Sequence, residues 1–124
     1  MPVGYVLVEG MRADARLDGL PLTLTKIERS RVDDATPDQP PVWTTVGFRF
    51  PDAEAERVAR ALARVIDARG GWYSHFNVAG ETFVIFADRI FRYAAGDETG
   101  RAEAAAYGRS VGVPESQLDW DESD

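Results

Sequence analysis

The 124-residue chain contains no cysteine, a single histidine (His75) and a single lysine (Lys26). The lack of cysteine excludes disulfides, thiolate catalysis and cysteine-ligated zinc. One histidine without cysteines cannot make a typical zinc site. The chain also lacks both common kinds of glycine-rich phosphate-binding loop. We therefore expect no metal and no cofactor.

Long apolar runs are missing as well. The longest one near the start, Val3–Val8, has six residues and ends at Glu9, whereas a membrane-spanning helix needs about 20. It also lacks the basic region and the apolar length of a signal peptide. Because arginine and alanine are abundant, as in proteins of GC-rich bacteria, we expect a bacterial cytoplasmic protein without membrane contact.

Positive charge is scarce toward the C-terminus. The formal net charge is −7, and residues 95–124 carry eight acidic residues against Arg101 and Arg109. Binding of nucleic acid requires a positive surface that neutralises phosphates, so this distribution argues against nucleic acid as a partner. The same charge would keep the protein soluble and could steer a basic protein partner.

Length and patterning predict one α+β domain over residues 1–124 with the order β-β-β-α-β-β-β-α. We expect a mainly antiparallel sheet with both helices packed on one face. Val3–Val8 is either a separate strand or the first half of the next one. The remaining strands are expected at Met11–Leu17, Leu20–Glu28, Val42–Phe50, Trp72–Val78, Thr82–Ala87 and Arg89–Tyr93, and helices from Pro51 to Gly70 and from Asp97 or Thr99 to about Val111.

Local patterns predict the first hairpin, one long loop and the C-terminal tail. Met11–Leu17 alternates apolar and charged residues, which is typical of a half-buried strand, and Asp18-Gly19 is typical of a tight hairpin turn. Prolines and aspartates predict a loop at residues 30–41, which is either mobile or functional. Residues 115–124 form an acidic C-terminal tail, whose Leu118 and Trp120 we expect to dock on the domain.

The best site candidate lies on the strand predicted at residues 72–78. Tyr73, His75 and Asn77 would share one face of this strand, because alternate side chains point the same way. Together they can bind or move protons, with Glu81 across the hairpin as a carboxylate that would orient the imidazole. The more common origin of such a pattern is an ordinary water-facing strand surface, or a core histidine with a satisfied hydrogen bond.

One short motif matches a catalytic pattern without its context. Gly108-Arg109-Ser110-Val111-Gly112 fits G-x-S-x-G, in which the serine occupies a sharp turn between a strand and a helix. Here Ser110 falls at the end of a predicted helix, and His75 precedes it although that fold places histidine last. We therefore do not expect Ser110 to be a nucleophile.

A second motif concerns RNA. Residues 80–86, Gly-Glu-Thr-Phe-Val-Ile-Phe, resemble the end of the RNP1 signature of RNA-recognition motifs. The resemblance would imply single-stranded RNA stacking on Phe83. It departs from the family pattern where Ala79 replaces a basic residue and Glu81 replaces the first stacking aromatic.

Three hypotheses for function follow, in this order. The first is a non-catalytic protein-interaction module that uses its sheet edge or its acidic C-terminal region to contact another protein or a second copy of itself. The second is a small ligand-binding or catalytic domain that uses Tyr73, His75 and Asn77. The third is binding of single-stranded RNA on the sheet.

Overall fold

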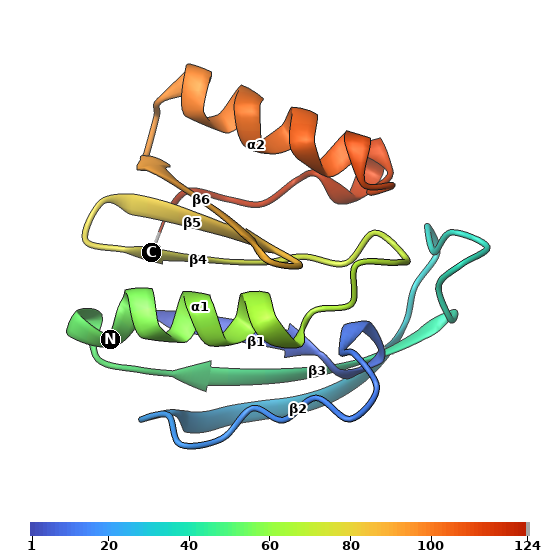
Figure 1. Cartoon of the computed structure of the whole chain (residues 1–124), viewed down its shortest axis with the longest axis horizontal. Helices are drawn as coiled ribbons and strands as arrows, with labels where there is room; N and C mark the ends of the chain where they lie inside the picture. The colour runs from blue at the N-terminus through green and yellow to red at the C-terminus, as the bar shows by residue number, and fades with distance from the viewer. Residues whose placement is uncertain (124) are drawn as a thin grey trace.

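The structure, a computed structural model that describes residues 1–123, has the predicted α+β class (Figure 1). The order β-β-β-α-β-β-β-α is confirmed. Short 3₁₀ turns at Val8–Gly10, Asp52–Glu54 and Glu115–Gln117 join some of the elements. The strands and helices are β1 (Val3–Leu7), β2 (Thr23–Arg31), β3 (Val42–Arg49), α1 (Ala55–Val65), β4 (Ser74–Val78), β5 (Glu81–Phe86), β6 (Arg89–Ala94) and α2 (Glu98–Ser110).

The strands form two antiparallel sheets rather than one. The first has the order β1-β3-β2 and the second the order β4-β5-β6. The two sheets adjoin where β1 lies beside β4, and the hydroxyl of Ser74 donates a hydrogen bond of 2.7 Å to the backbone carbonyl of Tyr5. In the first sheet β3 is central, so that Val46 stands opposite both Val6 and Ile27.

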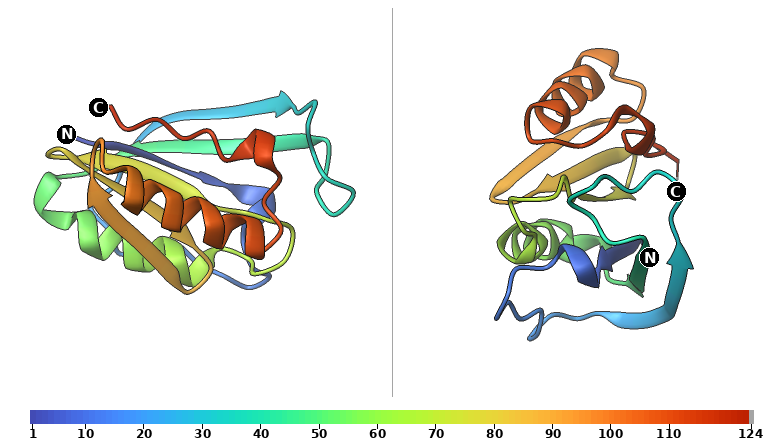
Figure 2. Two further views of the ribbon diagram at one scale, coloured as in Figure 1. Left: turned by 90° about the horizontal axis from the view of Figure 1, so that it is seen from above. Right: turned by 90° about the vertical axis from the view of Figure 1, so that its right-hand side faces the viewer.

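The helices pack on opposite faces of the second sheet, whereas we expected both on one face (right view of Figure 2). Phe83 and Ile85 of β5 join the core cluster beneath α1, and Val84 and Phe86 join the cluster beneath α2. The cause is visible in the sequence of β5, which is apolar at every position from Phe83 to Phe86. A strand without alternation is typical of a sheet buried on both faces.

One face of the first sheet packs against α1. Val6, Phe48 and Phe50 pack against α1, where Val58 and Leu62 are fully buried. The helix predicted from Pro51 to Gly70 is present, but α1 ends at Val65 instead of near Gly70. The next residue is extended and forms an isolated bridge with Met11.

The strand predicted at Met11–Leu17 is wrong, and so is the hairpin turn after it. The segment makes no ladder with β2; instead the backbone N–H of Arg12 donates to the carbonyl of Val65. The Arg12 guanidinium donates to the carbonyl of Ile66 and to Asp88. Because the end of α1 supplies these partners, the backbone needs no neighbouring strand. The returning strand starts at Thr23 and runs to Arg31, three residues beyond its predicted end.

The second helix begins and ends as predicted. Its N-cap is Asp97, whose carboxylate accepts a hydrogen bond of 3.1 Å from the backbone N–H of Gly100. At its C-terminus Gly112 has a φ of +94°, and the N–H of Val113 donates to the carbonyl of Gly108. This left-handed cap reverses the chain and directs the C-terminal tail back over the second sheet.

None of the helices within residues 1–123 is long and apolar enough to cross a membrane.

Candidate functional site

The C-terminal tail covers the strand face that carries the predicted site residues. The Tyr73 hydroxyl donates a hydrogen bond to the backbone carbonyl of Gln117. The Asn77 amide donates to the Asp121 carboxylate at 3.1 Å and to the carbonyl of Ser123 at 3.0 Å. Tyr73, His75 and Asn77 therefore share one face, as the spacing predicts, but this face is occupied by residues 117–123. Asp124, the last residue of the predicted tail, lies outside the described residues.

His75 is held between β1 and the tail. Its side chain is 18% exposed, its Nδ1 lies 3.4 Å from the Tyr5 hydroxyl, and its Nε2 lies 3.7 Å from an oxygen of Asp121. Burial lowers the pKa of His75 below 6.5, and the nearby Asp121 carboxylate opposes this shift. The ring is thus neutral at neutral pH. Glu81, the carboxylate expected to orient it, is instead bound by the guanidinium of Arg92.

The two tyrosines near His75 are poor proton donors. Burial raises the pKa of Tyr5 and of Tyr73 above the usual value of 10, and the negative charge of Asp119 raises both further. Their phenols therefore stay protonated and act as neutral hydrogen-bonding groups at neutral pH. Each of Tyr73, His75 and Asn77 thus has a partner from β1 or from the tail.

A buried anchor fixes the tail to the second sheet. Trp120 is 3% exposed, its indole N–H donates to the Tyr93 hydroxyl at 2.7 Å, and the Arg101 guanidinium lies over its ring. Glu122 accepts hydrogen bonds from Tyr93, Arg101 and the backbone N–H of Gly96. The predicted docking of Trp120 is confirmed, as is that of Leu118, which contacts Gly108 of α2.

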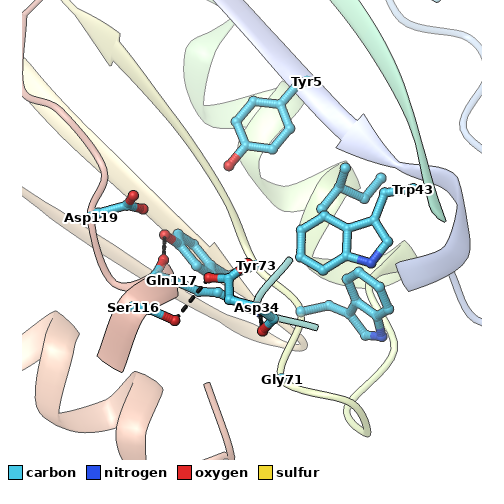
Figure 3. A pocket seen from close by; sticks show the side chains of 10 residues that line it. Tyr5, Asp34, Trp43, Gly71, Tyr73, Ser116, Gln117 and Asp119 are labelled. Atoms are coloured by element: carbon cyan, nitrogen blue, oxygen red, sulfur yellow. Dashed lines mark hydrogen bonds between the residues drawn. The ribbon is translucent and has the colours of Figure 1, made fainter. Parts of the chain in front are cut away.

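Docking of the tail creates a cleft of about 260 Å³ against the first sheet (Figure 3). Leu7, Trp43 and Trp72 supply apolar walls, and the two indoles meet edge to face at 5.1 Å. The polar lining comes from the two tyrosines, from the loop after β2 and from the tail. These residues are Tyr5, Tyr73, Asp34, Ser116, Gln117 and Asp119, and Gly71 completes the lining.

The loop predicted at residues 30–41 begins after Arg31 and forms part of this cleft. Asp34 accepts a hydrogen bond of 2.8 Å from the Ser116 hydroxyl. Gln39 is 6% exposed and its amide donates to the carbonyl of Gly70 at 2.6 Å. Gln117 bonds both Gln39 and the carbonyl of Asp34. The loop is therefore tied to the tail, and these ties hold the mouth of the cleft.

A second surface lies at the free edge of β2. The strand pairs with β3 on one side, and its other side pairs with no strand among residues 1–123. All nine residues of β2 are exposed, including Leu24 at 60% and Ile27 at 65%. Sequence analysis did not single out this edge or the cleft, because both depend on which segments lie beside which. It likewise missed Tyr5 and Asp121 as the partners of His75.

The remaining motifs lack the surroundings that their chemistry needs. Ser110 lies in the last turn of α2, where its hydroxyl donates to the carbonyl of Tyr107. Phe83 is 2% exposed beneath α1 and offers no open face to a base. No group of three or more acidic or histidine side chains within the described chain is placed to hold a metal ion.

Comparison of the chain with protein-family models, with curated proteins and with solved structures found no match.

Proposed function

We propose that this protein is a non-catalytic protein-interaction module that joins other chains by strand addition at β2. One observation carries the proposal: a nine-residue edge strand is exposed at every position and leaves its outer backbone groups unpaired within residues 1–123. Such an edge is a template for pairing with another strand. The partner that β2 itself matches best is a second copy of this chain.

Backbone geometry restricts how two β2 strands can pair. In an antiparallel pair, opposite residues direct their backbone groups either both toward or both away from each other. For two identical strands related by a twofold axis, the axis must therefore pass through a residue and not between two residues. A bulge between Leu24 and Lys26 interrupts the strand, so the regular part that can pair is Lys26–Arg31.

Charge then selects one register. An axis through Lys26, Glu28, Arg29 or Arg31 would place two like charges opposite each other, and an axis through Ser30 would place Arg29 opposite Arg31. An axis through Ile27 places Ile27 opposite itself and Lys26 opposite Glu28 of the second copy, so that residues 26–28 of each copy form the regular pair, up to the bulge. Opposite charges across strands attract and like charges repel. Charges on an edge strand often prevent pairing with another strand. Here the charges of two β2 strands attract each other in the register centred on Ile27, and in no other register of Lys26–Arg31.

The association would be weak and reversible. A single added strand buries less surface than the roughly 1,200 Å² of a stable interface, so we expect a dissociation constant of roughly 10–100 µM. Pairing would cover Ile27, which is 65% exposed in the isolated chain, and would join two three-stranded sheets into one of six strands.

Charge reversal tests both the association and its register. Lys26→Glu places an acid opposite Glu28 of the second copy, and Glu28→Lys places a base opposite Lys26 of the second copy. Because attraction becomes repulsion at two symmetric pairs, we expect each variant to dimerise at least about tenfold more weakly. Arg64→Glu and Glu103→Lys, at exposed helix positions, are controls with the same change of net charge. Sedimentation velocity at rising concentration measures the dissociation constant.

Mixing the two reversed variants provides the decisive comparison. In the heterodimer of the two variants each acid faces a base, so the mixture should dimerise more tightly than either variant alone. The double variant Lys26→Glu/Glu28→Lys should also recover the wild-type dissociation constant. A wild-type chain that stays monomeric at 1 mM, or a mixture that stays monomeric, would contradict self-association through β2.

A further inference from the structure

The cleft of about 260 Å³ lies apart from the outer edge of β2, and the charged residues in its lining are all of one sign. Its volume is below the roughly 300–1,000 Å³ of pockets that hold drug-sized ligands, so it suits a single side chain. The charged residues that line it, Asp34 and Asp119, are both acidic. An anionic ligand would meet two carboxylates there without a compensating base.

The negative charge reaches the interior of the cleft. Burial is the main cause of the raised pKa of Tyr5 and of Tyr73, and the Asp119 carboxylate raises both further, as an anion near a phenol does. Asp119 is exposed, and its side chain takes part in no hydrogen bond or ion pair with the rest of residues 1–123. Its charge is therefore free to meet a cation that enters the cleft.

The opposite wall is aromatic and fixed. The Trp43 indole N–H donates a hydrogen bond of 2.9 Å to the carbonyl of Pro40, and its ring contacts Trp72 edge to face. Figure 3 shows the Trp43 ring on one side of the cleft and Asp119 on the other, with the Tyr5 hydroxyl directed between them. An apolar stem could lie along the indole while its charged end meets the carboxylate, and the indole face itself attracts cations.

We propose that this cleft binds the side chain of a lysine or arginine residue presented by a second protein. The alkyl stem packs on Leu7 and Trp43, and the ammonium or guanidinium group is held by Asp119 and by the Tyr5 hydroxyl. This inference goes beyond strand addition at β2 and stands on different residues. It names the chemistry of a partner other than a second copy, and it agrees with the formal charge of −7.

The test uses matched small probes. N-acetyl-lysine amide and N-acetyl-arginine amide carry the proposed group, and N-acetyl-norleucine amide has the lysine stem without its charge. The indole signal of Trp43 and the backbone signals of Gly71 and Ser116 would be followed by NMR during titration. We expect the charged probes to shift these signals with a dissociation constant in the roughly millimolar range, and the norleucine probe to bind at least about tenfold more weakly.

A charge variant then localises the contact. Asp119→Asn should weaken binding of the lysine probe about five- to tenfold. Glu103→Gln, on the exposed side of α2, removes the same charge elsewhere and should leave the dissociation constant unchanged. The Lys26→Glu variant should bind the probe like the wild type. Loss of strand addition at β2 and loss of side-chain binding in the cleft can therefore be told apart.

Four results would overturn the proposal. The first two are equal binding of the lysine and norleucine probes, and no shift of the cleft signals at 50 mM probe. The third is an equal loss of affinity for the lysine probe in Asp119→Asn and Glu103→Gln. The fourth is a butylammonium ion that binds at least about tenfold more tightly than N-acetyl-lysine amide. The last result would assign the cleft to small free amines in place of protein side chains.

Discussion

The two three-stranded sheets are alike in size but differ in what covers them. In the second sheet, β5 is buried at every position from Thr82 to Phe86, with α1 on one face and α2 on the other. In the first sheet, the edge strand β2 is exposed at every position. Burial of apolar surface is the main favourable contribution to folding, so the second sheet stabilises the domain. The first sheet is left with surface that can contact another molecule.

The C-terminal tail adds to this asymmetry. Its Trp120 and Glu122 bond to Tyr93 of the second sheet, and its other side forms one wall of the cleft against the first sheet. The acidic segment that the sequence suggests as a free contact surface is thus partly used inside the molecule. Asp119 remains exposed on the cleft side, and Asp121 is 73% exposed over His75.

We expect the largest effect when an isoleucine is replaced by alanine in the second sheet, and a much smaller one for the same replacement in the first. Ile85→Ala removes a fully buried side chain from β5, and we expect it to lower the free energy of unfolding by about 2–5 kcal/mol. Ile27→Ala changes a side chain that is 65% exposed in β2, and we expect a change within about 0.5 kcal/mol. Urea unfolding at low protein concentration measures both. Similar losses of unfolding free energy in the two variants would show that these two strands contribute equally to stability.

A smaller effect is expected where the tail meets the second sheet. Glu122→Gln weakens the charged hydrogen bonds to Tyr93 and Arg101, and we expect it to lower the free energy of unfolding by about 1–2 kcal/mol. Glu103→Gln, which is exposed on α2, is the matched control and should have little effect. A Glu122→Gln variant as stable as the wild type would mean that the tail adds no stability through this residue.

The same contact predicts a dependence on pH. The bond from Tyr93, followed by those from Gly96 and Arg101, holds the pKa of Glu122 below 4.5. The unfolded chain therefore binds a proton at this site more readily than the folded chain. The stability difference between wild type and Glu122→Gln should be complete above about pH 5 and should disappear as the pH falls through the folded pKa. A difference that persists unchanged at lower pH would contradict this contact.

The smallest effect concerns the histidine at the junction of the sheets. The ring signals of His75 should titrate with a pKa below 6.5, and Asp121→Asn should lower the pKa further because it removes a charge that favours the imidazolium. Because the unfolded state binds the proton more readily, His75 should favour folding above about pH 6.5 and reduce stability as the pH falls below it. A wild-type pKa at or above 6.5 would indicate that burial does not dominate.

Much of the fold could be predicted from local patterns. The alternation on either side of His75 and the start of the second helix at Asp97 or Thr99 are predictions about neighbouring residues, and the structure agrees with both. The strand predicted at Met11–Leu17 has an equally regular alternation but is not a strand. Its backbone partners lie at the end of α1, about fifty residues away, and alternation says nothing about which distant group satisfies a backbone N–H.

The site could be predicted only as far as one face of one strand. That Tyr73, His75 and Asn77 share a face follows from the twofold periodicity of β-strands. Which groups meet that face does not, because Tyr5 is 70 residues from His75 in sequence and Asn77 is 44 residues from Asp121. The cleft draws its lining from β1, β3, the loop at 30–41, the segment 71–73 before β4 and the tail, and no local pattern marks such a convergence.

The sequence by itself determined the absence of thiol chemistry, the acidic charge, the α+β class and the order of the elements, because these depend on composition and on spacings of a few residues. Only the tertiary structure decided that there are two sheets, that the helices lie on opposite faces of the second, and that β2 keeps a free edge. Those outcomes depend on long-range packing, in which each apolar surface is buried against whichever element the whole chain can bring to it.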